Sequence, residues 1–278
     1  MNEDTSFRTK YEAAAARNRS LLCVGLDPDP ALIPEDVSSL DFLRAIVEAT
    51  ADLVCCFKPN AAFYEAEGEA GLGTLHALVE SIPEEVPVLL DAKRGDIGNT
   101  ATFYARAIFD EMHADAVTLN PYLGADALEP FFAYEDRHSF VLCRTSNASA
   151  RDLQDLVVGE GGLRLYEHVA LLANRWNTRG NVGLVVGATY PEEAARVRAL
   201  SPELLLLLPG VGAQAGELEA VVRGAVDAHR GGILVNASRS VLYAGRDAGA
   251  GDLAGYASAA RAAAAALRDA INAARDAG

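Results

Sequence analysis

The sequence lacks an apolar run long enough to cross a membrane, and its first ten residues, MNEDTSFRTK, do not have the pattern of a secretory signal. It also lacks CxxC pairs, and its histidines are scattered without the spacing of metal ligands. The four cysteines all lie in apolar, strand-like runs: Cys23, Cys55, Cys56 and Cys143. Such cysteines are typical of small core residues in a reducing compartment. We therefore expect a cytoplasmic protein with no membrane partner.

Basic residues are few relative to acidic ones. The chain has 24 Lys+Arg against 39 Asp+Glu, which gives a formal net charge of −15. Nucleic acids and anionic membrane surfaces attract proteins with the opposite balance of charge. We therefore expect no nucleic acid among the partners of this protein.

Lysine is the scarcest charged residue, because the chain contains only Lys10, Lys58 and Lys93 and every other basic residue is arginine. Two of these three lysines, Lys58 and Lys93, fall at predicted strands. The pKa of a buried lysine can be tuned so that it transfers a proton, whereas arginine stays protonated. The strand lysines therefore indicate proton transfer. The alternative is that they remain there by chance.

What the chain has in abundance is an alternation of short apolar runs with helical patterns. Eight runs predict strands: Leu21–Leu26, Val54–Phe57, Val88–Ala92, Ala116–Leu119, Ser139–Cys143, Val182–Val186, Leu204–Leu208 and Ile233–Val235. Helical patterns cover residues 8–19, 39–53, a stretch ending at 81, 100–112, 125–134, 162–177, 191–200, 216–229 and 257–274. Strands separated by helices predict an α/β protein with a parallel sheet, and eight units fit a (β/α)8 TIM barrel. We expect one domain over residues 1–278, with a leading N-terminal helix and an Ala-rich C-terminal helix. An open doubly wound sheet is the alternative.

The stretch from Val86 to Thr100, VPVLLDAKRGDIGNT, combines a buried strand with three charged residues. Asp91 and Lys93 are two residues apart, so on a strand they point to the same side. Asp96 follows in the loop, and the carboxyl ends of parallel strands are where α/β proteins place their chemistry. This pattern predicts a catalytic site. The alternative is a structural ion pair at the end of a strand.

Lys58 ends the preceding strand, which is the neighbour of the Asp91 strand in a barrel. Adjacent strands lie about 4.8 Å apart, so Lys58, Asp91 and Lys93 are expected to form an array of alternating charge with a further aspartate. Lys58 alone has a simpler interpretation as a lysine that extends its charge to solvent or pairs with an acid. Asp27, in LDPDP, has the simpler interpretation of a turn cap beside proline.

A second signal lies after the seventh and eighth predicted strands. Gly210, Gly212 and Gln214 follow one of them, and Ser238 and Arg239 follow the other. TIM barrels often bind phosphate between these two loops, on backbone N–H groups and a helix N-terminus. The sequence therefore predicts a phosphate site. The segment GVGAQA also fits a dinucleotide fingerprint, but no acidic residue lies about 20 positions further on.

Taken in order, the motifs at the strand ends resemble those of the orotidine 5'-phosphate decarboxylase family. They are GLDPD, FKPN with the downstream Tyr64, DAKRGDIGNT, NPYLG, CRTSN, PGVGAQ and NASR. They extend from about residue 21 to residue 240, each at the end of a predicted strand. CRTSN, with the long loop after it, resembles the longer bacterial and archaeal branch of the family.

The resemblance implies a barrel enzyme that converts orotidine monophosphate to UMP and CO2 in de novo pyrimidine synthesis, without a metal or an organic cofactor. It also implies a homodimer whose active sites are shared across the interface. By position, the catalytic residues are Lys58, Asp91, Lys93 (which protonates C6) and Asp96, and the substrate-binding residues are Asp27, Ile97, Thr100, Ser146, Gln214 and Arg239. In the family, the residues matching Asp96, Ile97 and Thr100 come from the neighbouring subunit. The resemblance also implies that Arg239 and Gln214 hold the 5'-phosphate and that Asp27 contacts the ribose. It implies that Ser146 contacts the pyrimidine, with an ordinary loop serine as the alternative.

Two other functions stay open. Sugar-phosphate enzymes of the same superfamily share the D-x-K-x-x-D strand but use Mg²⁺ with a glutamate at the position of Lys58, where a lysine repels a metal ion. A barrel that binds a nucleotide without turning it over is the other.

Overall fold

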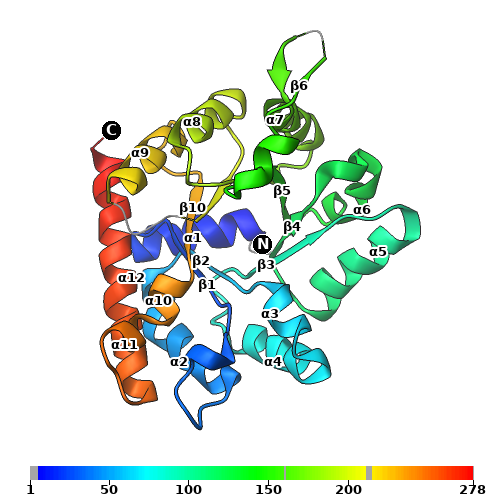
Figure 1. Cartoon of the computed structure of the whole chain (residues 1–278). Helices are drawn as coiled ribbons and strands as arrows, with labels where there is room; N and C mark the ends of the chain where they lie inside the picture. Colours follow the sequence, from blue (N-terminus) through cyan, green and yellow to red (C-terminus); the bar gives the residue numbers. More distant parts are fainter. Residues whose placement is uncertain (1–5, 160, 211–214, 278) are drawn as a thin grey trace, which may run out of the picture.

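The computed structural model describes residues 6–159, 161–210 and 215–277, and its centre is a barrel of eight parallel strands surrounded by helices (Figure 1). The barrel strands are β1 (Leu22–Gly25), β2 (Cys56–Lys58), β3 (Leu89–Arg94), β4 (Ala116–Leu119), β5 (His138–Arg144), β8 (Val182–Val186), β9 (Leu206–Pro209) and β10 (Ile233–Ala237). They are hydrogen-bonded in the order β2-β1-β10-β9-β8-β5-β4-β3.

Two isolated parallel bridges join the ends of that order and close the barrel. Phe57 pairs with Val88, and Asn60 pairs with Asp91, which links β2 to β3. The predicted (β/α)8 barrel is therefore confirmed, and the open sheet is wrong. The assignment of residues 1–278 to this one domain stays a prediction. Closure matters for function because it gathers the carboxyl ends of all eight strands around one opening.

Helices surround the barrel and cover its outer face (Figure 1). They are α1 (Phe7–Asn18), α2 (Ser39–Thr50), α3 (Ala61–Glu65), α4 (Gly68–Ser81), α5 (Gly98–Arg106), α6 (Glu129–Phe132), α7 (Leu165–Trp176), α8 (Pro191–Leu200), α9 (Ala215–Ala225), α10 (Arg239–Leu242), α11 (Ala244–Asp247) and α12 (Leu253–Asp276). The Ala-rich α12 packs between α2 and α9, which flank it on either side. No helix in the described part of the chain is long and apolar enough to span a membrane.

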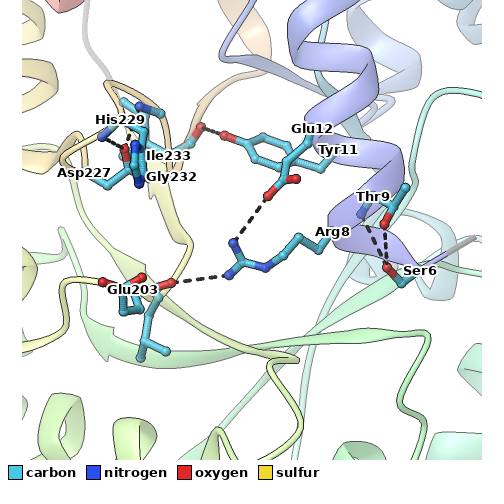
Figure 2. A network of polar contacts seen from close by, with 12 residues as sticks. Ser6, Arg8, Thr9, Tyr11, Glu12, Glu203, Asp227, His229, Gly232 and Ile233 are labelled. Carbon is cyan, nitrogen blue, oxygen red and sulfur yellow. Dashed lines mark hydrogen bonds and ion pairs between the residues drawn. The ribbon is translucent and has the colours of Figure 1, made fainter. Parts of the chain in front are cut away.

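The leading helix α1 closes the amino-terminal end of the barrel. Tyr11 donates a hydrogen bond from its hydroxyl to the carbonyl of Ile233 at 2.9 Å, and Arg8 reaches the carbonyl of Glu203 (Figure 2). The Phe7 ring is buried and packs against His138 of β5, with 5.2 Å between ring centroids. One end of the barrel is thus plugged, and the carboxyl end is left for chemistry.

His138 is buried in this plug without a hydrogen-bond partner for Nε2 among the described residues. A Cβ on Gly183, in β8, would lie 2.9 Å from that nitrogen and 2.9 Å from the Phe140 ring, so only glycine leaves room for both rings. Burial, and next the positive charge of Arg8, lower the pKa of His138 to about 3. The imidazole is therefore neutral at physiological pH.

The segment after β5 differs from the prediction. The helix predicted over residues 162–177 begins only at Leu165, because Leu163–Arg164 pairs with Val157–Val158 in a short antiparallel hairpin, β6 and β7. The carboxylate of Glu167 accepts a hydrogen bond from the backbone N–H of Arg164 at 2.8 Å and fixes the start of α7. Two-residue strands leave no periodicity to detect, so this hairpin was not predicted.

Other predicted helices are interrupted or shifted. The stretch ending at residue 81 is two helices, α3 and α4, and the predicted helix over 100–112 is α5 followed by a π-helical turn, Ala107–Glu111. Short 3₁₀ turns replace the end of one predicted helix, at Ala51–Leu53, and the start of another, at Ala125–Ala127 (η5). Further 3₁₀ turns lie between the predicted elements, at Pro30–Leu32, Pro121–Leu123 (η4) and Ala148–Asp152. The four cysteines are free and buried, as predicted.

Candidate active site

Two lysines and one aspartate meet at the carboxyl end of the barrel. Lys58 is the last residue of β2, and Asp91 lies beside it in β3. The Asp91 carboxylate lies between the two ammonium groups, with Lys58 Nζ 3.1 Å from Oδ2 and Lys93 Nζ 2.6 Å from Oδ1. The structure thus brings three of the four predicted catalytic residues together, in an alternating order of charge.

The two lysines differ in their access to solvent. The side chain of Lys58 is 4% exposed and that of Lys93 is 49% exposed, with Asp91 between them at 13%. Lys58 therefore forms the floor of the site, whereas Lys93 faces its mouth. A ligand that enters the barrel opening meets Lys93 first.

The electrostatics of the array keep its inner members ionised. Burial by itself lowers the pKa of an amine, but the charges of Asp91 and Asp27 outweigh it and raise the pKa of Lys58. Burial raises the pKa of Asp91, but Lys58 and Lys93, together with hydrogen bonds from Lys93 and Thr118, lower it to about 2. At neutral pH the site therefore holds a carboxylate that is fixed between positive charges.

The loop after β1 brings Asp27 to the same opening. Asp27 Oδ1 accepts a hydrogen bond from the backbone N–H of Asn60 at 3.1 Å, which ties it to the residues that follow Lys58. Tyr243 also fixes this loop. Its hydroxyl donates a hydrogen bond to the Asp27 carbonyl at 3.0 Å and accepts one from the Asp29 N–H at 2.7 Å. Asp27 is thus held in place, and sequence reasoning did not identify Tyr243.

A cavity of about 560 Å³ opens next to Asp27. Its lining includes Gly210 after β9 and the residues that end β10, among them Asn236, Ser238 and Arg239. The Arg239 guanidinium makes no ion pair or hydrogen bond to another described residue, which leaves it for an anion. Gly210 has φ +83°, a backbone conformation that favours glycine. The other predicted phosphate residues, Gly212 and Gln214, lie outside the described residues.

Ser146 lies on the rim of this region. A Cβ on Gly187 would come within 3.0 Å of the Ser146 Cβ, and one on Gly210 would lie 3.5 Å from its hydroxyl oxygen. Ser146 therefore sits between the ends of β8 and β9, with its side chain exposed. This position is compatible with contact to a ligand in the opening.

Asp96, Ile97 and Thr100 do not join the array within one chain. Asp96 Oδ1 accepts a hydrogen bond from the N–H of Ile97 at 2.8 Å, and no ion pair links Asp96 to Lys58 or Lys93 in the described part of the chain. Ile97 is 62% exposed, and Thr100, in the first turn of α5, is exposed as well. Among the described residues, none of the three has a hydrogen bond or ion pair to the charged array of its own chain.

Thr118, in β4, is a further residue at the site that sequence reasoning missed. Its hydroxyl donates a hydrogen bond to Asp91 Oδ1 at 2.8 Å and accepts one from the backbone N–H of Lys93 at 2.9 Å. The signal in the sequence is one polar residue inside the apolar run AVTL. A lone threonine is common in buried strands, so this signal is weak without the strand register.

Comparisons with known proteins identify the family of this chain. The profile of the orotidine 5'-phosphate decarboxylase / HUMPS family matches residues 20–253. The orotidine 5'-phosphate decarboxylase of Roseiflexus castenholzii is 53% identical over 275 residues, covering 97% of this chain and 98% of the relative. That of Herpetosiphon aurantiacus is 51% identical over 86% of this chain and 90% of its own. The structure of Leishmania donovani OMP decarboxylase superimposes with a TM-score of 0.85 at 41% identity, covering 98% of this chain and 100% of that one. The chain therefore belongs to the orotidine 5'-phosphate decarboxylase / HUMPS family.

Proposed function

We propose that this protein is an orotidine 5'-phosphate decarboxylase, which converts orotidine monophosphate to UMP and CO2 without a metal or an organic cofactor. The observation that carries the proposal is the Lys58–Asp91–Lys93 array at the carboxyl end of the barrel, where a cavity lined by Asp27 and Arg239 also lies. The relatives at about half identity over nearly the full chain carry the same name.

Lys93 performs the proton transfer. When the bond between C6 and the carboxylate breaks, its electron pair stays on C6, and the nearby ammonium of Lys93 stabilises that negative charge. Lys93 then donates a proton to C6, which completes UMP, and it regains a proton from solvent. Its 49% exposure at the mouth of the barrel suits both steps.

Asp91 and Lys58 prepare the site for that step. The Asp91 carboxylate, with a pKa of about 2, stays charged and holds Lys93 through a contact of 2.6 Å. It also faces the departing carboxylate, whose repulsion from Asp91 is relieved when CO2 leaves. Lys58 balances the charge of Asp91 from below at 3.1 Å.

The remaining predicted residues bind the substrate away from the reacting carbon. Arg239 and Gln214 hold the 5'-phosphate, Asp27 contacts the ribose hydroxyls and Ser146 contacts the pyrimidine. The Arg239 guanidinium, which lines the cavity and has no ion pair or hydrogen bond to any other described residue, supports the phosphate role. Binding energy from this remote group also helps the chemical step, because it positions C6 against Lys93.

The active unit is a homodimer in which Asp96, Ile97 and Thr100 complete the site of the neighbouring subunit. The lack of an ion pair between Asp96 and its own array among the described residues, and the exposure of Ile97, support this arrangement. Further large apolar side chains on α5 and η4 are also exposed: Phe103 (58%), Tyr122 (80%) and Leu123 (45%). Exposed apolar groups of this size favour burial against a second copy.

Mixing two inactive variants tests the shared site. In a hybrid of Lys93→Ala and Asp96→Asn subunits, one site carries both substitutions and the other carries neither. We expect an equal mixture, after subunit exchange, to regain about a quarter of wild-type activity, as a two-fold dimer with random pairing predicts. No recovery in a mixture shown to contain hybrids would contradict shared sites.

The rival sugar-phosphate activity depends on Mg²⁺, which an ammonium at the position of Lys58 repels. Assays after treatment with EDTA distinguish the two functions, because loss of turnover that Mg²⁺ restores would favour the rival. A non-catalytic nucleotide-binding barrel would instead bind UMP tightly and leave orotidine monophosphate unchanged.

The direct experiment is to mix the pure protein with orotidine monophosphate and follow the loss of orotate absorbance. Absence of that loss at high enzyme concentration would refute the proposed function.

A further inference from the structure

Strand β3 is irregular where it carries the catalytic residues. Its register against β4 places Leu90 opposite Val117 and Arg94 opposite Leu119, so three residues of β3 face one residue of β4. Extra residues of this kind form a bulge, which bends a strand and re-aims its side chains. The bulge consists of Asp91, Ala92 and Lys93, and the residue opposite is Thr118.

The Thr118 hydroxyl replaces the backbone pairing that the bulge removes. It accepts the N–H of Lys93 at 2.9 Å, and it donates to Asp91 Oδ1 at 2.8 Å. The same oxygen of Asp91 receives Lys93 Nζ at 2.6 Å. The Thr118 hydroxyl therefore bonds to Asp91 and Lys93, the two ends of the bulge. Its acceptor on Asp91 is the same oxygen that binds the Lys93 ammonium.

The conformation of Lys93 requires such support. Its φ is +48°, in the left-handed region that non-glycine residues adopt only where the surroundings enforce it. Thr118 is 1% exposed, so water does not replace its hydroxyl. Without the hydroxyl, the Lys93 N–H has no acceptor among the described residues, and Asp91 has lost one of the donors that fix its orientation.

We propose that Thr118 is a positioning residue for decarboxylation, whose hydroxyl holds the β3 bulge so that the Asp91 carboxylate and the Lys93 ammonium keep their mutual orientation. The inference rests on the proposed function. Thr118 acts through Asp91 and Lys93, and it leaves the phosphate cavity, on the other side of the opening, unchanged. Its removal is therefore expected to affect turnover rather than nucleotide affinity.

Three variants isolate the hydroxyl. Thr118→Val keeps the branched shape and removes the oxygen, Thr118→Ser keeps the oxygen and removes the methyl group, and Thr118→Ala removes both. Thr50→Val is the matched control, because Thr50 is also fully buried and its hydroxyl donates to a carbonyl, that of Ile46 at 2.7 Å, within α2. The comparison of Ala with Ser retains the test of the hydroxyl even where Val does not fold.

We expect Thr118→Val and Thr118→Ala to lower kcat by about 100-fold, the effect of a small misplacement of catalytic groups, while the Kd for UMP stays near the wild-type value. Thr118→Ser is expected to recover most of kcat, and Thr50→Val to leave it unchanged. Wild-type kcat in Thr118→Val, or equal loss in Ser and Ala, would overturn the inference. Failure of the wild-type protein itself to decarboxylate orotidine monophosphate would instead overturn the proposed function, so the two failures are distinguishable.

Discussion

At the scale of single residues, Lys93 combines a close ion pair with access to solvent. Its ammonium is held by an ion pair of 2.6 Å, and yet nearly half of its side chain is open to solvent. Lys58, 4% exposed, has the first property without the second. This difference suits Lys93 to proton donation and Lys58 to holding charge.

Replacement of Lys93 tests its role directly. We expect Lys93→Ala to lower kcat by about 10³-fold or more, because it removes both the proton donor and the charge that stabilises C6. Circular dichroism is expected to show an intact barrel. Lys10→Ala is the control, since Lys10 pairs with Asp115 at 2.8 Å, remote from the array. Substantial remaining turnover in Lys93→Ala would contradict the assignment.

Replacement of Arg239 tests the phosphate site. We expect Arg239→Ala to raise KM by about 10- to 100-fold, the value of a lost charge-assisted hydrogen bond, with a smaller effect on kcat. Arg246→Ala, which removes an exposed arginine on α11, serves as the control. An unchanged KM for Arg239→Ala would exclude contact with the phosphate.

The sequence predicted those site residues whose charged side chains stand out at the ends of apolar strands. Lysines and aspartates at strand ends are conspicuous, so Lys58, Asp91 and Lys93 were predicted to meet, and they do. Thr118 and Tyr243 were not predicted, because a hydroxyl acquires its role only from what lies opposite. That information resides in the strand register and in loop packing, neither of which periodicity encodes.

At the scale of elements, the connections at the amino-terminal end of the barrel are held by one buried arginine. Arg198, near the end of α8, donates hydrogen bonds to five backbone carbonyls: those of Ala225, Ser201, Pro202, Leu204 and Gly232. These carbonyls belong to the connections that enter β9 and β10. Arg198 thus fixes how both phosphate-side strands begin.

Substitution of Arg198 is therefore expected to destabilise the fold. Arg198→Lys keeps the charge but cannot reach the same carbonyls, and it leaves several of them buried without a donor. We expect a loss of about 3 kcal/mol in the free energy of unfolding, measured by urea denaturation. Arg223→Lys, on the exposed face of α9, is expected to change little. Equal stability of the two variants would show that the carbonyls find other partners.

The order of the elements could be predicted, but their exact ends could not. Eight apolar runs identified eight strands because buried parallel strands are apolar on both faces. The β3 bulge and the β6–β7 hairpin depend on cross-strand pairing and on single contacts such as Glu167 with Arg164. Local sequence patterns contain neither.

At the scale of the whole molecule, the plug at the closed end of the barrel makes stability depend on pH. His138 has a pKa of about 3 in the folded state, against 6.5 for an ordinary histidine. The unfolded chain therefore binds a proton at this residue well before the folded chain does. The stability that results is present above pH 6.5 and is lost as the pH falls from 6.5 toward 3.

Replacement of His138 is expected to remove this contribution. Between pH 7.5 and pH 5, the wild-type protein is expected to lose about 2 kcal/mol more in the free energy of unfolding than His138→Phe, since each pH unit below 6.5 contributes about 1.4 kcal/mol. Urea denaturation at several pH values measures the difference, and His76→Phe, on the exposed side of α4, controls for the substitution. Parallel pH curves for wild type and His138→Phe would contradict a neutral, buried His138.

The three lysines also differ in how they present themselves to chemical reagents. The side chain of Lys93 is 49% exposed, against 22% for Lys10 and 4% for Lys58. Amine-directed dyes, cross-linkers and activated resins thus find their most accessible lysine at the mouth of the barrel. The rate at which such reagents modify Lys93 therefore reports whether a ligand occupies the mouth of the barrel. Coupling to a surface through amines would block this site, so immobilisation is better directed at the 39 acidic residues.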